Sequence, residues 1–435
     1  MSLALPSDRA DKPTAPRSWL ARALRDAEWL TGERARIYAR LWLAVSVIVS
    51  VVWVALSRGG VDLAGHALGT DFTSFWTASQ MSLAGHAQAI YDPSPIGAHH
   101  AAETRLFGRD VGYFAFYYPP VFLLLCLPLA LAPYLVSLTL WLAATALAYL
   151  KVVRGFLGEA ARKGQVGWVA MLAFPAVLSN IGHGQNAFLS AALFGGGALL
   201  LDRRPLLAGV LLGSLVFKPH LGLVIPLALL AGGRWRSIFG AAVAVIGLCA
   251  ASLAVFGPDV WRAFLAASPA ARIALEQNLV GYEKMQSVFA AVRLLHGGVG
   301  LAYAAQGLAA LCACVGLVAA QRKAFRAPAE GPAMVCAALL ASPFLLDYDL
   351  ILLAIPLAWL TAEGLKSGFR PWEKLILAAG FLLPALSRTL AGSLSLPLGP
   401  VVISAVFWLV LRRWLTEPRA PAERQSPAGS RLTVV

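Results

Sequence analysis

Apolar stretches long enough to cross a lipid bilayer recur along almost the whole of this sequence, from residue 41 to residue 415. About 20 apolar residues in an α-helix span a bilayer, and a helix satisfies its own backbone hydrogen bonds there. Only 13% of the 435 residues are charged, against roughly 25% in ordinary soluble domains. The sequence therefore predicts an all-α, polytopic membrane helical bundle with about 12 spans.

The positive charges indicate which loops face the cytoplasm. A net charge of +14 can indicate nucleic-acid binding, but here Lys and Arg cluster in short loops beside the apolar stretches. That distribution follows the positive-inside rule, so we expect membrane lipids rather than nucleic acid as partners. The prediction is a cytoplasmic amphipathic arm at 1–40, a transmembrane domain at 41–415, and a disordered cytoplasmic tail at 416–435. Residues 58–117 and 257–297 become two long outer loops. We expect no cleavable signal peptide.

Several apolar stretches are too short or too interrupted to be simple spans. Residues 118–152, which contain Pro128 and Pro133, are assigned one net crossing. Loosened backbone at membrane depth is tolerated where it lines a cavity, so a polar pocket is expected at the outer face. The short segments fall into two pairs with polar tips: 205–217 and 219–232 around Lys218, and 332–345 and 348–362 around Asp347 and Asp349.

The first outer loop contains a predicted helix with an acid at its start, "DFTSFWTASQMSLAG" from Asp71. Asp71 is either a helix N-cap or a cavity-facing carboxylate, and the two roles are compatible. Phe72, Phe75, Trp76 and Leu83 follow at near-helical spacing. They either rest on the lipid interface or pack on the bundle.

Four stretches in order carry a resemblance to a known family. They are "DFTSFWTASQMSLAGHAQAIYD" with the following "YYPPVFLLLCLPLALAP", then "GHGQNAFLSAALF" through "VFKPHLGLVIPL", then "MQSVFAAVRLL", and "SPFLLDYDLILLAIPL". The chain resembles glycosyltransferase family 87 (GT87), whose members use polyprenyl-phosphate sugars and belong to the GT-C class. Gln185 and Asn186 are adjacent here, whereas the family has a residue between them.

The resemblance implies a glycosyltransferase in a bacterial inner membrane with its active site facing the periplasm. Asp71 would be the catalytic base, taking a proton from an acceptor hydroxyl in an inverting displacement. The donor would be a sugar, mannose or a relative, on a polyprenyl phosphate, and the acceptor a lipid or a glycan. A place that often carries two histidines in actinobacterial members holds Tyr348 and Asp349 here, so donor identity is not carried over.

The remaining candidate residues each have two interpretations. Lys218 either contacts the donor phosphate or extends to the outer interface. Gln185 and Asn186 bind sugar hydroxyls or close a turn, and Gln286 and Ser287 have the same alternatives. Tyr118 stacks on a sugar or anchors the interface. Asp347 and Asp349 have two interpretations as well. They belong to a plain exposed turn, or Asp349, which is beside Tyr348, binds sugar hydroxyls.

Other classes of site are not indicated. His99 and His100 are joined by no acid cluster beyond Glu103, so no metal is expected. The "FGGGAL" run around Gly195 lies within a span rather than in a phosphate loop, and no cofactor is expected. The alternatives to an active transferase are a transporter or flippase, a polymerase or ligase of cell-envelope glycans, and an inactive family member.

Overall fold

The computed structural model describes residues 19–92, 97–323 and 328–416, and this part of the chain is helical. It contains no β-strand, only isolated β-bridges such as the one between Met285 and Leu346. The predicted all-α fold class is confirmed. Residues 1–18 of the predicted arm and 417–435 of the predicted tail lie outside the described residues.

Seven helices are long and apolar enough to cross a membrane, which indicates a multi-pass membrane protein. Shorter apolar helices accompany them, so the count of about 12 crossings remains a prediction. The seven are α2 (Gly32–Leu56), α6 (Tyr134–Leu157), α14 (Trp235–Glu276), α16 (Val299–Lys323), η5 with α18 (Asp347–Leu353 and Ala354–Ser367), α19 (Glu373–Leu394) and α20 (Leu398–Thr416). The shorter ones are α5 with η2 (Pro120–Cys126, Leu129–Leu131), α10 (Ala187–Leu200), α11 with η3 (Pro205–Gly213, Ser214–Phe217), α12 and α13 (Pro219–Gly222, Val224–Ala231) and α17 (Glu330–Ala341).

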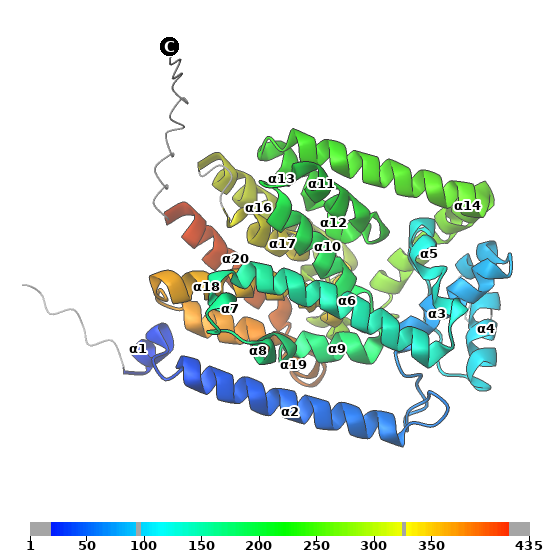
Figure 1. The fold of residues 1–435 in the computed structure, drawn as a ribbon, viewed down its shortest axis with the longest axis horizontal. Coiled ribbons are helices and arrows are strands. Elements are labelled where there is room, and N and C mark those ends of the chain that lie inside the picture. The colour runs from blue at the N-terminus through cyan, green and yellow to red at the C-terminus, as the bar shows by residue number, and fades with distance from the viewer. Residues whose placement is uncertain (1–18, 93–96, 324–327, 417–435) are drawn as a thin grey trace, which may run out of the picture.

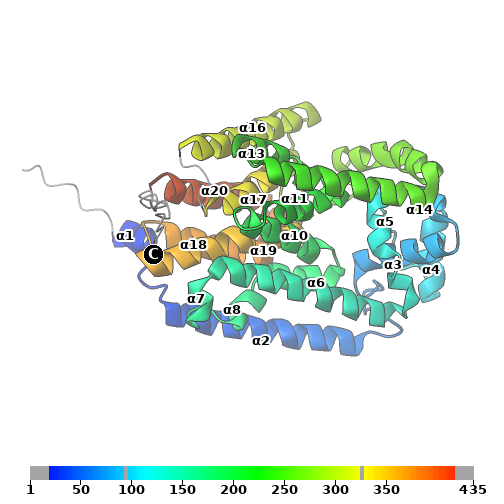
Figure 2. The ribbon, with the colours of Figure 1, turned by 45° about the horizontal axis from the view of Figure 1, so that its top comes forward.

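The remaining helices are short, and several of them lie at the two ends of the bundle. Figures 1 and 2 show α1 at the end where α18 and α20 finish, and α3 and α4 at the opposite end. The long helices run between these ends. The short elements are α1 (Trp19–Asp26), α3 (Thr70–Leu83), η1 (Ala87–Tyr91), α4 (Ala98–Phe107), α7 (Glu159–Arg162), α8 (Trp168–Leu172), α9 (Pro175–His183), η4 (Tyr282–Lys284) and α15 (Val288–Leu294).

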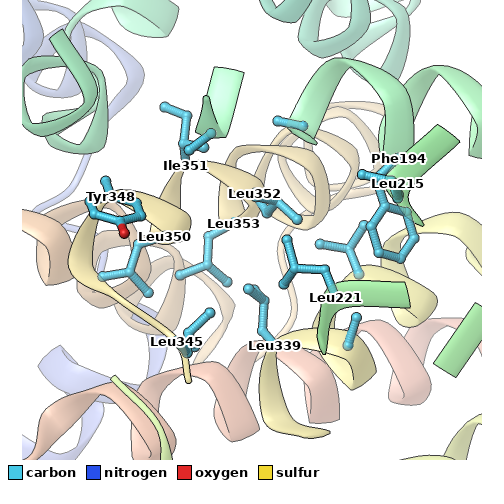
Figure 3. Packing of buried hydrophobic residues seen from close by; sticks show 14 of the residues in the cluster. Phe194, Leu215, Leu221, Leu339, Leu345, Tyr348, Leu350, Ile351, Leu352 and Leu353 are labelled. Atoms are coloured by element: carbon cyan, nitrogen blue, oxygen red, sulfur yellow. The ribbon is translucent and has the colours of Figure 1, made fainter. Parts of the chain in front are cut away.

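The core forms around α17 and η5, in which every residue is buried. A helix that is apolar on all sides is stable only when other elements surround it. Figure 3 shows Leu345 and the leucines and isoleucine of η5 beside Leu339 of α17, with Leu221 and Phe194 from neighbouring helices. By contrast, α2 lies along one face and is largely exposed to the surroundings of the bundle. The polar tip at residues 347–349 is therefore placed by the most buried part of the molecule.

Prolines divide the ambiguous region after the first outer loop. Helix α5 begins at Pro120, a favoured first helical position, and ends before Pro128. Helix α6 follows Pro133 and is long enough to span. The stretch 118–152 therefore holds the short helix α5 and most of the span-length helix α6, and its single net crossing stays a prediction.

The aromatic stripe of α3 packs on the bundle. Phe72, Phe75 and Trp76 are buried, and only Leu83 is exposed. The ring centres of Phe75 and Phe122 are 5.0 Å apart, and the two rings meet in the edge-to-face arrangement that aromatic pairs favour. The interpretation that this stripe rests on the lipid interface was wrong for its aromatic members.

Candidate active site

Asp71 lies in the first turn of α3, but it is not the N-cap. The cap position is Gly69, which has φ +72° and supplies no side chain. The Asp71 carboxylate is directed instead toward the segment after α9. The capping interpretation of Asp71 was wrong, so its side chain is available for another role.

Two glycines let the start of α3 and the end of α9 touch through their backbones. Gly184 follows α9 with φ +63°, a conformation that glycine adopts without strain. A Cβ atom on Gly184 would lie 2.6 Å from Phe72 Cβ and 3.2 Å from Gly69 Cα. This close approach places the side chain of the next residue, Gln185, beside Asp71.

Gln185 fixes the Asp71 carboxylate. Its Nε2 donates to Asp71 Oδ2 at 2.9 Å. Its Oε1 accepts from the Tyr118 hydroxyl at 3.1 Å and from the Asn186 backbone N–H at 2.7 Å, which holds the amide in one orientation. Gln185 is buried, whereas 22% of the Asp71 side chain remains exposed. Asp71 Oδ1 accepts no hydrogen bond from the described residues, so one oxygen is available to a substrate.

His183 lies on the other side of Asp71. Its Nδ1 is 3.7 Å from Asp71 Oδ2 and 2.9 Å from Thr70 Oγ1. The imidazole is partly exposed. Its ring meets the Tyr348 ring edge-on, with the two ring centres 5.6 Å apart. Residues from three separate segments, α3, α9 and η5, therefore meet at one place.

Lys218 and Asp349 form a buried ion pair beside Tyr348. Lys218 Nζ donates to Asp349 Oδ1 at 2.7 Å, and the two side chains are 3% and 2% exposed. The ammonium also lies 5.2 Å from the centre of the Tyr348 ring. The interpretations of Lys218 as an interface lysine and of residues 347–349 as an exposed turn were both wrong, because the two tips bury and neutralise each other.

Three other predicted site residues, Gln286, Ser287 and Asn186, are buried and make contacts within the protein. The Gln286 backbone N–H donates to Leu345 O at 2.7 Å, which joins the end of the second outer loop to the segment before η5. Ser287 caps α15 by accepting from the Ala290 N–H. Asn186 is fully buried at the start of α10. All three residues are buried, and their contacts with a substrate stay predictions.

The structure adds residues that the sequence reasoning did not single out. Arg388 of α19 approaches Asp347, with Nη1 to Oδ2 at 3.7 Å. Arg388 is the one charged residue between Lys374 and Arg412 in the sequence, a signal that was not used. Gly69 and Gly184 were missed because their function depends on each other. Among the described residues, no group of three or more His, Cys, Asp or Glu is placed to hold a metal.

The comparison with protein families decides the class. The model of glycosyltransferase family 87 matches residues 116–343, which is more than half of the chain. The chain belongs to glycosyltransferase family 87. Neither the curated proteins nor the solved structures gave a match. The matched region of this family 87 glycosyltransferase includes Tyr118, Gln185 and Lys218, while Asp71 and Asp349 reach the same site from outside it.

Replacing Gly184 by alanine is expected to push apart the backbones of α3 and the segment after α9, which position Asp71 and Gln185. A non-glycine residue in a left-handed conformation costs about 1–3 kcal/mol, and the added methyl group also collides with Phe72. We expect a lower free energy of unfolding and a loss of transfer activity. Gly182→Ala is the matched control, because nothing lies within 4 Å of a Cβ there. Equal unfolding midpoints for the two variants would contradict this account.

Behind α3, burial keeps Glu103 of α4 neutral. Desolvation raises the pKa of Glu103 from 4.5 to about 9, and it lowers the pKa of the neighbouring His99 from 6.5 to about 4. The folded protein therefore retains a proton on Glu103 that the unfolded chain releases above pH 4.5. The contribution of this carboxyl to stability is complete below that pH and is lost as pH rises toward about 9.

Glu103→Gln is accordingly expected to stabilise the family 87 transferase progressively as pH rises. The gain in the free energy of unfolding is about 3 kcal/mol at pH 7, since one pKa unit corresponds to about 1.4 kcal/mol. Unfolding midpoints measured between pH 5 and pH 9 test this, and Glu28→Gln, at an exposed position, serves as the control. A difference between Glu103→Gln and the parent that does not grow with pH would refute the buried neutral carboxyl.

Proposed function

We propose that this membrane glycosyltransferase moves a sugar, mannose or a related hexose or pentose, from a polyprenyl phosphate to a lipid or glycan acceptor. The proposal rests on how the two oxygens of the Asp71 carboxylate are engaged. One of its oxygens is held by Gln185, and the other is unoccupied by the described residues at a partly exposed site. That is the arrangement expected of a general base, which needs a fixed orientation and a free lone pair.

In the proposed reaction Asp71 removes the proton from an acceptor hydroxyl. The acceptor oxygen forms a bond to the anomeric carbon as the bond from that carbon to the phosphate oxygen breaks. The polyprenyl phosphate leaves with the electron pair, and the anomeric configuration is inverted. Because phosphate is already a good leaving group, the reaction needs a cation near it rather than an acid catalyst.

The proposed location is the periplasmic face of a bacterial inner membrane. Helix α3, which carries Asp71, lies at the end of the bundle opposite α1 and the ends of α18 and α20 (Figures 1 and 2). Basic residues occupy the last turns of α16, α18 and α20. Under the positive-inside rule that basic end is cytoplasmic, which supports an outward-facing Asp71.

The position of Asp71 on α3, at one end of the bundle (Figure 1), favours a transferase over a transporter. A transporter would place coupling acids at the bilayer midplane between repeats. A polymerase using diphosphate-linked donors would present exposed arginines in the second outer loop. Arg262 and Arg272 are 74% and 70% exposed there, so this alternative stays open, whereas Arg293 donates to the Tyr282 hydroxyl and to Gly297 O.

A reconstitution assay tests the proposal. The purified full chain in phosphatidylcholine nanodiscs would be given radiolabelled polyprenyl-phosphate-mannose and a membrane lipid extract, and the products separated by chromatography. We expect a new labelled lipid that is absent with heat-treated protein. If no lipid-linked hexose or pentose yields a product while the protein remains folded, the transferase proposal fails and the transporter class is favoured.

A further inference from the structure

Lys218, the cation first expected at the phosphate, is already neutralised. Its ammonium donates to Asp349 at 2.7 Å, and both side chains are almost fully buried. A phosphate could reach it only by displacing Asp349, which would leave a carboxylate buried without a cation. Such a state costs several kcal/mol in proteins, so Lys218 is poorly placed to receive a charged ligand.

Arg388 has the opposite properties. Its side chain is 47% exposed, and its one ion pair among the described residues, to Asp347, is 3.7 Å long. It donates no hydrogen bond to any described residue. A guanidinium carries five N–H donors in a planar fork that matches phosphate oxygens in pairs. Arg388 is thus a cation at the site with its donors unused.

The position of Arg388 relative to Asp71 suits an in-line displacement. Asp347 is next to Tyr348, whose ring faces His183, and His183 in turn contacts Asp71. Arg388 therefore reaches this group of residues through Asp347, and no contact among the described residues joins it to Asp71. The base and the leaving phosphate must lie on opposite faces of the sugar, which requires such a separation.

We propose, on the basis of the proposed function, that Arg388 binds the phosphate group of the polyprenyl-phosphate donor and of the released carrier. Two N–H groups of the guanidinium would bind two phosphate oxygens in parallel, as arginine does with phosphate in general. Lys218 then acts as a positioning residue, because its pair with Asp349 fixes the segment that presents Tyr348. The recognised chemistry is a phosphate monoester on a long apolar chain.

Binding of farnesyl phosphate and of farnesol to the purified full chain in phosphatidylcholine nanodiscs tests this assignment. The two probes differ only in the phosphate group, and the excess of lipid headgroups competes for any nonselective cation. Charge-assisted hydrogen bonds are worth about 1.5–3 kcal/mol, so Arg388→Gln should weaken farnesyl phosphate binding about 10- to 100-fold. Farnesol binding should be unchanged, which also shows that the variant is folded.

Two further variants sharpen the test. Arg388→Lys should recover part of the affinity, since it keeps the charge but not the fork. Arg262→Gln, at an arginine whose side chain is 74% exposed in the second outer loop, should bind like the parent. If Arg388→Gln still binds farnesyl phosphate in preference to farnesol as strongly as the parent does, the role of Arg388 is overturned, but the proposed donor class is not. A parent protein that binds farnesyl phosphate no better than farnesol would instead overturn the proposed donor class.

Discussion

Asp71→Asn is expected to abolish sugar transfer while leaving the protein folded. A positioned general base contributes about 10²–10⁴-fold to a rate, and asparagine cannot accept the proton. Its side-chain oxygen can still accept the hydrogen bond from Gln185 Nε2, so the contact between α3 and the segment after α9 is retained. Initial rates of transfer from polyprenyl-phosphate-mannose, together with unfolding midpoints, measure both effects.

The matched control for this change is Asp110→Asn. Asp110 belongs to the same outer loop, its side chain is 69% exposed, and its contact is to His100 rather than to the residues around Asp71. We expect this control to keep the parental rate. A rate in Asp71→Asn within about tenfold of the parent would exclude Asp71 as the general base.

Lys218→Met is expected to have the largest effect on stability. It leaves Asp349, whose side chain is 2% exposed, as a buried carboxylate without its cation. Removing one partner of a buried ion pair typically costs about 3–5 kcal/mol. The free energy of unfolding in denaturant, measured on the purified protein, should fall by this amount. A variant as stable as the parent would show that the pair is not formed in the membrane.

The double variant Lys218→Met with Asp349→Leu separates stability from catalysis. Replacing a buried ion pair by apolar residues is often neutral or stabilising, so most of the lost stability should return. If transfer also returns in part, Lys218 acts through position, as the assignment of phosphate binding to Arg388 requires. If the double variant is stable but remains inactive, and Arg388→Gln still binds farnesyl phosphate normally, direct phosphate contact by Lys218 is the better explanation.

Much of the helical organisation was predictable because it depends on local sequence. Hydropathy over a window of about 20 residues defines a spanning helix whatever surrounds it. Prolines at 120, 128 and 133 mark helix boundaries because each lacks a backbone N–H and fixes φ. The helix from residue 70 and the short hairpin around Lys218 were therefore recognisable before the structure was known.

The site was predictable as a set of residues but not as a set of contacts. Asp71, Gln185, Lys218 and Tyr348 were all candidates, yet each also had a structural interpretation of comparable merit. Gln185 meets Asp71 across 114 positions, and Lys218 meets Asp349 across 131. No local pattern reports such pairings, because they depend on how α9 and η5 pack in the bundle.

The amino-acid sequence by itself determined that this chain is a helical membrane protein, where its helices begin, and which scarce ionisable residues adjoin them. Only the tertiary structure decided which of these residues are free to act. Packing buried Lys218 with Asp349 and left Asp71 and Arg388 partly exposed. The physical reason is that the energy of a charge depends on its surroundings, which distant segments supply and local sequence does not encode.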